Sequence, residues 1–316
     1  MRILVTGADG FAGRYLLRHL LSTGHDVLGA VRPGANAARD WLTDEEYRQV
    51  AWLGLELADP GSVNRLFSTP VDAIVHLAAI ASSADARRDP GQAWVVNAGG
   101  TARLLESAAL ARQEGRADPL VLIVSSGEVY GPGSGRRPES APVVPVSPYA
   151  ASKAGAELAA GEVGRRTGLR IITVRAFQHT GPGQPDTYVV PAFARRLRRA
   201  RREGVVQVPV GNLTPVRDIS DVRDVVTAYT ALLVRGTPGE TYNVCRGEGV
   251  SLLGLFRKLS VLVGVDAEPV PDSSLSRPAD ILDLVGDNSR LRAATGWSPS
   301  VSLEQTLRDV VHAQTD

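Results

Sequence analysis

A tyrosine and a lysine stand four residues apart in SPYAASKAGAE, the segment that spans residues 147 to 157. If this alanine-rich segment is helical, Tyr149 and Lys153 are neighbours on one face of the helix. An ammonium group close to a phenol lowers the pKa of the phenol, which can then give or take a proton near neutral pH. A lone Y-x-x-x-K also arises from a tyrosine that packs over a turn beside a solvated lysine, so the rest of the chain has to decide.

A second group of polar residues follows the apolar run LVLIV. Ser125, Ser126 and Glu128 come directly after it, in SSGEVYG. Ligands of parallel α/β sheets bind outside the carboxyl ends of the strands, where a serine hydroxyl can hydrogen-bond a substrate oxygen alongside the Tyr149 phenol. Asn97 is a further polar residue, within the otherwise apolar helical segment VVNAGGT.

Three glycines near the start of the chain indicate a phosphate-binding turn. The segment VTGADGFAGRYLL places Gly7, Gly10 and Gly13 between a strand-like run and an amphipathic helical run. The spacing is G-x-x-G-x-x-G, but the physical task is that of the common G-x-G-x-x-G: a tight turn, a backbone close to a pyrophosphate and a helix N-terminus that faces the anion. A glycine triplet can also be a packed turn, and its place between the first strand and the first helix favours a dinucleotide cofactor.

The end of the expected second strand, VLGAVRPG, indicates which dinucleotide is bound. An acidic residue there would bind the ribose 2'-hydroxyl of NAD, whereas this chain has Arg32, which can pair with the 2'-phosphate of NADP. A solvated arginine is the alternative. The sequence favours NADP, as NADPH, over NAD. Glu56 and Leu57 are expected to close the third strand, where they would flank the adenine ring.

The elements that must position these residues alternate through the first half of the chain. Apolar runs such as RILVTG, HDVLGAVR, DAIVHLAA and LVLIVSS are separated by helix-like segments. This alternation predicts an α/β fold with a doubly wound parallel sheet of Rossmann type and helices on both faces. After GLRIITVRAF the pattern changes to a Gly/Pro-rich loop and shorter mixed segments. We predict an NADP-binding domain over residues 1–175 and a smaller mixed α/β substrate-binding lobe over 176–316, partly interleaved with the first.

Composition and charge exclude several function classes. The 316 residues are 43% hydrophobic and carry a net charge of +1, which gives no general attraction to nucleic acid or membranes. No apolar run has the length of a membrane span, and Met1 leads directly into a strand-like run, so we expect neither a membrane anchor nor a signal peptide. Cys245 is the only cysteine and the histidines show no ligand spacing, so we expect no disulfide, no metal site and a cytoplasmic location.

A run of arginines between Arg195 and Arg202 raises the question of nucleic-acid binding. The neutral overall charge and the absence of interleaved aromatic residues argue against that function. The run is more typical of a solvated helix face, with one or two arginines turned toward an anionic ligand.

Together the motifs resemble the extended short-chain dehydrogenase/reductase family, the superfamily of nucleotide-sugar epimerases and dehydratases. The resemblance covers the whole chain and rests on TGADGFAG at residues 6–13, SSGEVYG at 125–131 and Y-x-x-x-K at 149–153. It implies a catalytic triad of Ser126, Tyr149 and Lys153, in which Tyr149 is the acid/base and Lys153 holds the nicotinamide ribose and lowers the phenol pKa. It implies cofactor contacts from Gly7, Gly10, Phe11, Ala12, Gly13, Arg32, Glu56, Leu57, Leu77, Ala78, Ala79, Asn97, Tyr149 and Lys153.

The second half of the chain looks like the GDP-4-dehydro-6-deoxy-D-mannose reductases of this family. The resemblance is carried by VRAFQHTGPGQPDTYVVPAFARRL, GNLTPVRDISDVRDVVTAY, ETYNVCRGEG and VGDNSRLRAATGWSPSVSLEQTLRD. The implied reaction is the NADPH-dependent reduction of a nucleotide-sugar C4 ketone, giving GDP-D-rhamnose in deoxysugar biosynthesis from GDP-mannose. Asn212, Arg217 and Arg277 would hold the diphosphate and nucleotide, and Asp280 the nucleotide ribose. The other implied substrate contacts are Gln178, His179 and Val190.

The chain departs from the family pattern at one motif. The usual R-P-F-N-H reads R-A-F-Q-H here, so Ala176 and Gln178 replace a proline and an asparagine. Gln178 adds a methylene beside the expected sugar and phosphate. The departure bears on the identity of the sugar more than on the reaction.

Two other functions compete with the reductase. A 4,6-dehydratase or epimerase of the same family, which retains its NAD(P), would use Glu128 as an essential carboxylate. Against it, Gly127 supplies no side chain where dehydratases usually have a polar one, and RDISDVRDVV departs from the dehydratase pattern. A non-catalytic dinucleotide-sensing protein is the alternative from another class, but such proteins typically lose the triad. The family resemblance also implies a homodimer joined through helices around residues 97–112 and 149–166.

Overall fold

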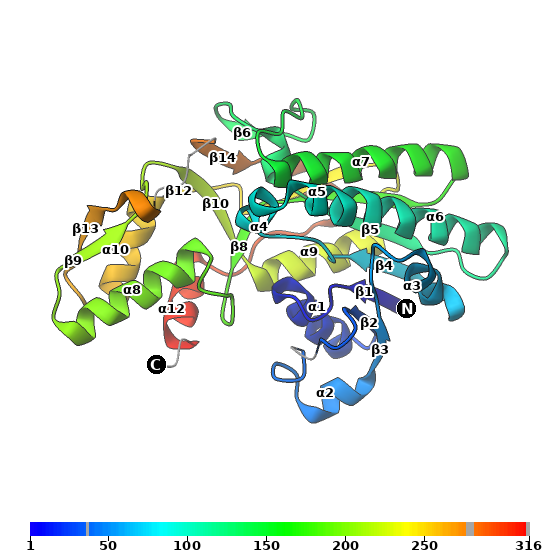
Figure 1. Cartoon of the computed structure of the whole chain (residues 1–316), viewed down its shortest axis with the longest axis horizontal. Coiled ribbons are helices and arrows are strands. Elements are labelled where there is room, and N and C mark those ends of the chain that lie inside the picture. Colours follow the sequence, from blue (N-terminus) through cyan, green and yellow to red (C-terminus); the bar gives the residue numbers. More distant parts are fainter. Residues whose placement is uncertain (36–37, 276–280, 314–316) are drawn as a thin grey trace.

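The computed structural model describes residues 1–35, 38–275 and 281–313. Its largest sheet consists, in spatial order, of β3 (Val50–Gly54), β2 (Asp26–Val31), β1 (Arg2–Thr6), β4 (Ala73–His76), β5 (Leu120–Ser126), β7 (Ile171–Ala176) and β11 (Thr241–Val244). All neighbouring strands in it are parallel. The chain proceeds outward first on one side of β1 and then on the other (Figure 1), which confirms the predicted doubly wound α/β fold.

Helices cover both faces of this sheet (Figure 1). One face packs against α1 (Phe11–Ser22), α9 (Val222–Arg235) and α11 (Ser289–Thr295). The other face packs against α3 (Pro60–Arg65), α6 (Gly100–Gln113) and α7 (Pro148–Thr167). Because both faces are covered, the central strands are apolar on both sides, and every residue of β4 is buried.

Helix α7 begins at residues with clear helix-start chemistry. Ser147 is its N-cap and accepts a hydrogen bond from the Ala150 N–H at 3.1 Å, and Pro148 follows in the first turn. The helix ends at Gly168, which has a left-handed φ of 70°. Tyr149 and Lys153 therefore lie in the first two turns of α7, at the carboxyl edge of the sheet.

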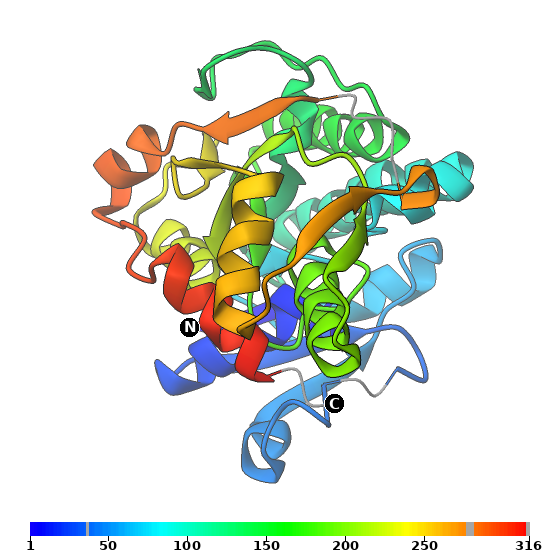
Figure 2. The ribbon, with the colours of Figure 1, turned by 90° about the vertical axis from the view of Figure 1, so that its left-hand side faces the viewer.

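The smaller lobe has its own sheets, which Figure 2 shows from the front, and its own hydrophobic core. One sheet contains β12 (Gly249–Ser251), β10 (Val216–Asp221), β14 (Asp283–Gly286) and β6 (Arg136–Arg137), with β8 (Gln178–Thr180) paired to β10. A parallel pair is formed by β9 (Gln207–Val210) and β13 (Glu268–Pro271). The core lies among α8 (Val189–Glu203), α10 (Leu252–Val263) and α12 (Leu303–Ala313). In it the rings of Phe193 and Phe256 meet edge to face, 5.5 Å apart.

The chain passes between the two lobes more than once. β7 ends at Ala176, next to the expected boundary at residue 175. Helix α9 and strand β11 then return to the main sheet, where β11 pairs with β7. In the other direction, β6 leaves the first half of the chain to pair with β14. These crossings place residues from both halves of the chain around the junction of the lobes.

Shorter helical segments join the main elements. They are α2 (Asp44–Gln49), α4 (Ser83–Arg88), α5 (Pro90–Ala93), a π-helical turn (Trp94–Gly99) and 3-10 turns at Leu66–Ser68, Gly127–Tyr130 and Ser273–Leu275. Among the described residues, the helices are too short or too polar to cross a membrane.

The arginine-rich face of α8 connects the helices of the smaller lobe. Arg198 donates to the Val311 carbonyl oxygen at 3.2 Å, and Arg201 donates to the Val263 carbonyl oxygen at 2.9 Å. Both acceptors lie near helix C-termini, where cationic donors are favourable. Part of the arginine run therefore serves the packing of the lobe.

Candidate active site

Ser126, Tyr149 and Lys153 come together at the carboxyl edge of the main sheet. Ser126 is the last residue of β5, and its side chain hydrogen-bonds the Tyr149 phenol. The Lys153 ammonium donates to the Val124 carbonyl oxygen at 2.7 Å. Burial lowers the pKa of Lys153 to about 8, and the carboxylate of Glu157, one turn further along α7, opposes that shift.

The surroundings of Tyr149 keep its phenol protonated. Burial is the main cause of a raised pKa, the charge of Glu128 raises it further, and the hydrogen bond with Ser126 acts in the opposite direction. We predicted that Lys153 would lower the pKa of Tyr149, and this prediction is wrong, because the pKa is raised. The reason is that the ammonium is held by a backbone carbonyl of β5, while burial and a carboxylate both disfavour a phenolate. The phenol is suited to donate a proton.

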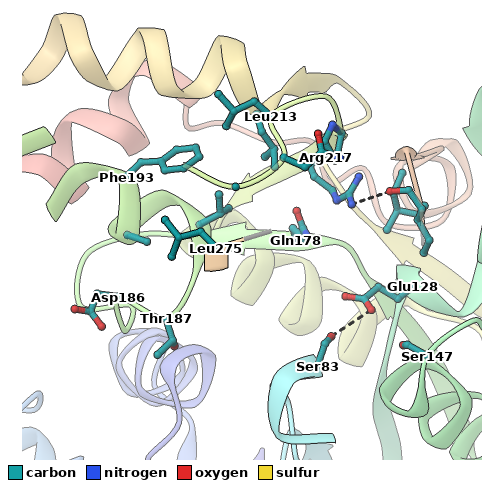
Figure 3. Close-up of a pocket in the computed structure, with 18 of the residues that line it drawn as sticks. Ser83, Glu128, Ser147, Gln178, Asp186, Thr187, Phe193, Leu213, Arg217 and Leu275 are labelled. Carbon is teal, nitrogen blue, oxygen red and sulfur yellow. Dashed lines mark hydrogen bonds between the residues drawn. The ribbon is translucent and has the colours of Figure 1, made fainter. Parts of the chain in front are cut away.

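Glu128 connects the triad to a neighbouring cavity. Its backbone N–H donates to Ser126 Oγ at 3.2 Å, and its carboxylate accepts a hydrogen bond from Ser83 Oγ at 3.4 Å (Figure 3). Gly127 stands between Ser126 and Glu128, and a Cβ there would lie 3.0 Å from the Phe177 ring. A side chain at this central position would therefore press on the Phe177 ring.

The glycine-rich turn fits a dinucleotide phosphate. Gly7 has a left-handed φ of 66°, and a Cβ on it would lie 2.8 Å from the Ala78 backbone nitrogen. A Cβ on Gly13 would lie 2.2 Å from the Gly7 carbonyl oxygen. Gly10 is the N-cap of α1, which has no side-chain cap and no acidic residue in its first turn. The first N–H groups of the helix are therefore available to an anion.

Most of the other predicted cofactor residues surround this turn. The Gly7 N–H donates to the Ala30 carbonyl oxygen at 2.9 Å, which holds the turn against the end of β2, and the exposed Arg32 follows that strand. The Ala78 N–H donates to Thr6 Oγ1 at 3.1 Å, which places the segment after β4 beside the same turn. The remaining predicted residues in these two places are Phe11, Ala12, Leu77 and Ala79.

Glu56 and Leu57 do not close β3 as we predicted, since β3 ends at Gly54. The Glu56 N–H donates to Ser62 Oγ at 2.9 Å, and the Glu56 carboxylate accepts from the Ala58 N–H at 3.1 Å. These local bonds replace sheet pairing and turn the chain toward α3.

Asn97 lies in the π-helical turn and joins two parts of the site. Its side-chain oxygen accepts from the Ile80 N–H at 2.8 Å, and its amide nitrogen donates to the Ile80 carbonyl oxygen at 3.1 Å and to Ser152 Oγ at 2.9 Å. Ser152 directly precedes Lys153. Asn97 therefore positions the segment after β4 relative to the helix that carries Tyr149 and Lys153.

A cavity of about 550 Å³ lies at the junction of the lobes, and its lining includes Glu128 and Ser147, each two positions from a triad residue (Figure 3). Glu128, Gln178, Asn212 and Arg217, all predicted site residues, line it. Gln178 Oε1 is buried and has no hydrogen-bond partner among the described residues. Because buried polar atoms are normally paired, this oxygen is suited to accept a hydrogen bond from a ligand.

Arg217 holds one wall of the cavity together. Its Nη1 donates to the carbonyl oxygens of Val216 at 2.8 Å and Leu282 at 3.0 Å, and its Nη2 donates to that of Ile281 at 2.9 Å. Burial lowers the pKa of Arg217, and the charge of Glu128 counteracts this. These three bonds use three of the five N–H donors of the guanidinium, which leaves two donors for a ligand.

Other residues in the predicted substrate set lie elsewhere. His179 stacks on Phe11, with ring centroids 6.1 Å apart, and burial lowers the pKa of His179. Val190 is buried in the core of the smaller lobe, and its neighbour Val189 lines the cavity. Two predicted residues lie outside the described part of the chain, Arg277 and Asp280.

The cavity also contains residues that the motifs did not identify. They include Ser83, Arg87, Asp186, Thr187, Arg195 and Arg196. The arginine run indicated that one or two of its members would face a ligand, and Arg195 and Arg196 do line the cavity. Ser83 and Arg87 have helical spacing, but no sequence signal places α4 opposite α8.

Comparison with known proteins finds similarity over nearly the whole chain. The family model described as GDP-mannose 4,6 dehydratase matches residues 4–310. The chain is 32% identical over 316 residues to the GDP-6-deoxy-D-mannose reductase of Pseudomonas aeruginosa, which covers 98% of this chain and 96% of that protein.

Two solved structures share the arrangement of both lobes. RMD from Pseudomonas aeruginosa, complexed with NADPH, superposes with a TM-score of 0.81 and 31% identity over 99% of this chain and 98% of that chain. The UDP-glucose 4-epimerase of Thermus thermophilus, in complex with NAD, superposes with a TM-score of 0.84 and 30% identity over 99% and 98% of the two chains. Since each match covers 99% of this chain, it includes segments of both lobes.

Proposed function

Because the chain belongs to the GDP-mannose 4,6-dehydratase family of extended short-chain dehydrogenases/reductases, we propose that it is an NADPH-dependent reductase of a nucleotide 4-keto-6-deoxyhexose. In its most specific form, the proposed reaction converts GDP-4-dehydro-6-deoxy-D-mannose to GDP-D-rhamnose. Family membership confirms the predicted resemblance and the predicted class, an NAD(P)-dependent oxidoreductase-type enzyme of nucleotide-sugar metabolism. NADP is favoured and NAD is the alternative, in line with the NADPH and NAD of the two similar structures.

The observation that carries the proposal is a protonated phenol beside the cavity. Tyr149 has a raised pKa and a hydrogen bond with Ser126, and Glu128 extends from this pair into the cavity wall. Reduction of a ketone needs a proton donor at the carbonyl oxygen, and a neutral phenol is such a donor.

In the proposed mechanism each residue of the triad has one task. Bound NADPH supplies the hydride. Tyr149 donates its proton to the developing alkoxide, and the Ser126 hydroxyl steadies the same oxygen. Lys153, which is anchored to the Val124 carbonyl oxygen, holds the nicotinamide ribose close to Tyr149.

The proposed cofactor contacts follow the geometry of the first lobe. The turn through Gly7, Gly10 and Gly13 and the N-terminus of α1 bind the pyrophosphate. Arg32 pairs with the 2'-phosphate of NADP. The segment after β4 is held in place by Asn97 and lies against the bound dinucleotide.

The proposed substrate contacts come chiefly from the smaller lobe. We assign residues 1–175 to the NADP-binding domain and 176–316 to the nucleotide-sugar lobe, partly interleaved. Gln178, with its unpaired buried oxygen, faces the sugar, and Asn212 and Arg217 face the nucleotide diphosphate. GDP is the proposed nucleotide.

We also propose a cytoplasmic homodimer. The elements expected at the interface expose large apolar side chains: Trp94 is 47% exposed, Leu110 44% and Leu158 76%. They lie on the π-helical turn, α6 and α7, and burial of such residues against a second copy would remove apolar surface from water.

A 4,6-dehydratase is the second candidate, since Glu128 lies at the cavity with its carboxylate bonded to Ser83. Dehydration and epimerisation begin with removal of a hydroxyl proton from the sugar, which needs a base. Gly127 adds no polar side chain to assist that removal, and the chain is 32% identical to the reductase but 27% and 28% identical to two GDP-mannose 4,6 dehydratases of Arabidopsis thaliana. The reductase is therefore the better-supported function.

The experiment that tests the proposal is incubation of the purified protein with NADPH and a panel of nucleotide 4-keto-6-deoxysugars. We expect stoichiometric oxidation of NADPH with the GDP-linked sugar and a C4 alcohol of one configuration as product. Turnover of a nucleotide-sugar by protein-bound NADP, without added reductant, would assign the enzyme to the dehydratases or epimerases instead.

A further inference from the structure

The cavity beside the triad carries more positive than negative charge. Its described lining includes the carboxylates of Glu128 and Asp186 and four arginines: Arg87, Arg195, Arg196 and Arg217. Guanidinium groups donate paired hydrogen bonds to phosphate oxygens. The lining is therefore suited to a ligand with several negative charges, as in a diphosphate.

Three of these arginines belong to the smaller lobe and are oriented by contacts within it. Arg217 serves three backbone carbonyls. Arg195 forms an ion pair with Asp186 at 2.7 Å, and Arg196 donates to the Pro209 carbonyl oxygen at 3.3 Å. A guanidinium has five N–H donors, so the contacts of Arg195 and Arg196 leave further donors for a ligand.

The fourth arginine comes from the first lobe. Arg87 and Ser83 are four residues apart in α4 and therefore share one face of this short helix. Both residues line the cavity, so this face borders it. Ser83 on that face reaches Glu128. The next residue, Arg88, lies on a different face, where it pairs with Asp85 at 2.9 Å and is 80% exposed.

We propose that Arg87 binds the diphosphate of the nucleotide-sugar across the cavity from Arg195 and Arg196, so that both lobes hold the same anion. The inference rests on the proposed function and adds a binding residue to it. An anion between guanidinium groups of different lobes also stabilises the lobes against each other, since it is attracted to both.

The test compares Arg87→Gln with the matched control Arg88→Gln, which removes the adjacent arginine of the same helix. Binding of GDP and of guanosine to the full chain with saturating NADP is measured by isothermal titration calorimetry. Arg87→Gln should weaken GDP binding about tenfold or more, because a charge-assisted hydrogen bond is lost, and should leave guanosine binding unchanged. Arg88→Gln should match the wild type with both ligands. The affinity of Arg87→Lys for GDP should lie between those of the wild type and Arg87→Gln, since lysine keeps the positive charge but lacks the paired donors of a guanidinium.

Three outcomes would overturn the inference, and one of them would overturn the proposed function as well. Wild-type affinity for GDP in Arg87→Gln would remove Arg87 from the diphosphate site and leave the proposed function standing. If Arg87→Gln lost equal affinity for GDP and for guanosine, the substitution would have changed the shape of the cavity, and this result would also contradict a contact with the phosphates. A wild-type protein that binds none of GDP, UDP and dTDP would remove the nucleotide-sugar function together with the inference.

Discussion

Lys153 Nζ donates a hydrogen bond to the carbonyl oxygen of Val124 at 2.7 Å. This contact ties the second turn of α7 to β5, the strand that ends in Ser126. Tyr149, one turn earlier on the same helix, is thereby held beside Ser126. Tyr149, the proposed proton donor, and its neighbours Ser126 and Lys153 are thus all held at the carboxyl edge of the parallel sheet.

The first prediction concerns pH and Lys153. Burial lowers the pKa of Lys153 to about 8, so its ammonium is present below that pH and lost as the pH rises through it. If this ammonium holds the ribose, affinity for NADPH, measured by fluorescence titration, should fall above about pH 8. Lys153→Met should bind NADPH more weakly at neutral pH and show no such fall. Lys258→Met is the control, because Lys258 is an exposed lysine paired with Glu304. An affinity in the wild type that stays constant from about pH 7 to about pH 9.5 would contradict this role.

Removal of the Tyr149 hydroxyl should abolish most activity without loss of the fold. Tyr149→Phe keeps the ring but removes the proton donor, and general acid catalysis contributes about 10²–10⁴-fold. The rate of NADPH oxidation with GDP-4-keto-6-deoxymannose should drop by at least that range. Tyr229→Phe is the matched control, since Tyr229 is buried and its hydroxyl has no hydrogen-bond partner among the described residues. A fully active Tyr149→Phe enzyme would exclude the proposed mechanism.

Glu128→Gln separates the reductase from the dehydratase. In a reductase the carboxylate removes no proton from C5, so the variant should lose activity only modestly, through the altered contact of its side chain with Ser83. In a dehydratase the same change should abolish turnover. NADPH oxidation is compared between Glu128→Gln, Tyr149→Phe and Ser83→Ala, which removes the donor to the carboxylate. A Glu128→Gln enzyme as inactive as Tyr149→Phe would favour lyase chemistry.

Arg32 should determine the preference for NADPH. A guanidinium that faces the 2'-phosphate makes a charge-assisted contact of about 1.5–3 kcal/mol, or roughly a tenfold to hundredfold effect on affinity. Arg32→Ala should therefore raise the KM for NADPH and leave the KM for NADH little changed. Arg48→Ala, at an exposed arginine bonded to the Asp44 carbonyl oxygen, should change neither. An equal rise of the KM for NADPH and for NADH in Arg32→Ala would show that Arg32 does not contact the 2'-phosphate.

The sequence by itself determined the features that depend on short stretches of chain. Alternating apolar runs and helical segments predicted the doubly wound sheet, because strand and helix periods appear within a few residues of sequence. The turn through Gly7 was predictable because few residues other than glycine adopt a left-handed φ without strain. The start of α7 also depends on local chemistry, since the Ser147 cap and the fixed φ of Pro148 involve only neighbouring residues.

The tertiary structure decided what depends on residues that are distant in sequence. The raised pKa of Tyr149 follows from burial and from Glu128, 21 positions earlier in the chain, and neither effect is visible in Y-x-x-x-K. We predicted that Val190 contacts the substrate, but Val189 lines the cavity and Val190 is buried in the core, because of the way α8 packs in the smaller lobe. Arg87 lines the same cavity as Arg195 and Arg196 only because α4 and α8, which are far apart in sequence, come together at the junction of the lobes. Burial and electrostatic interaction depend on distances in space, and those distances are set only when the separate elements pack together.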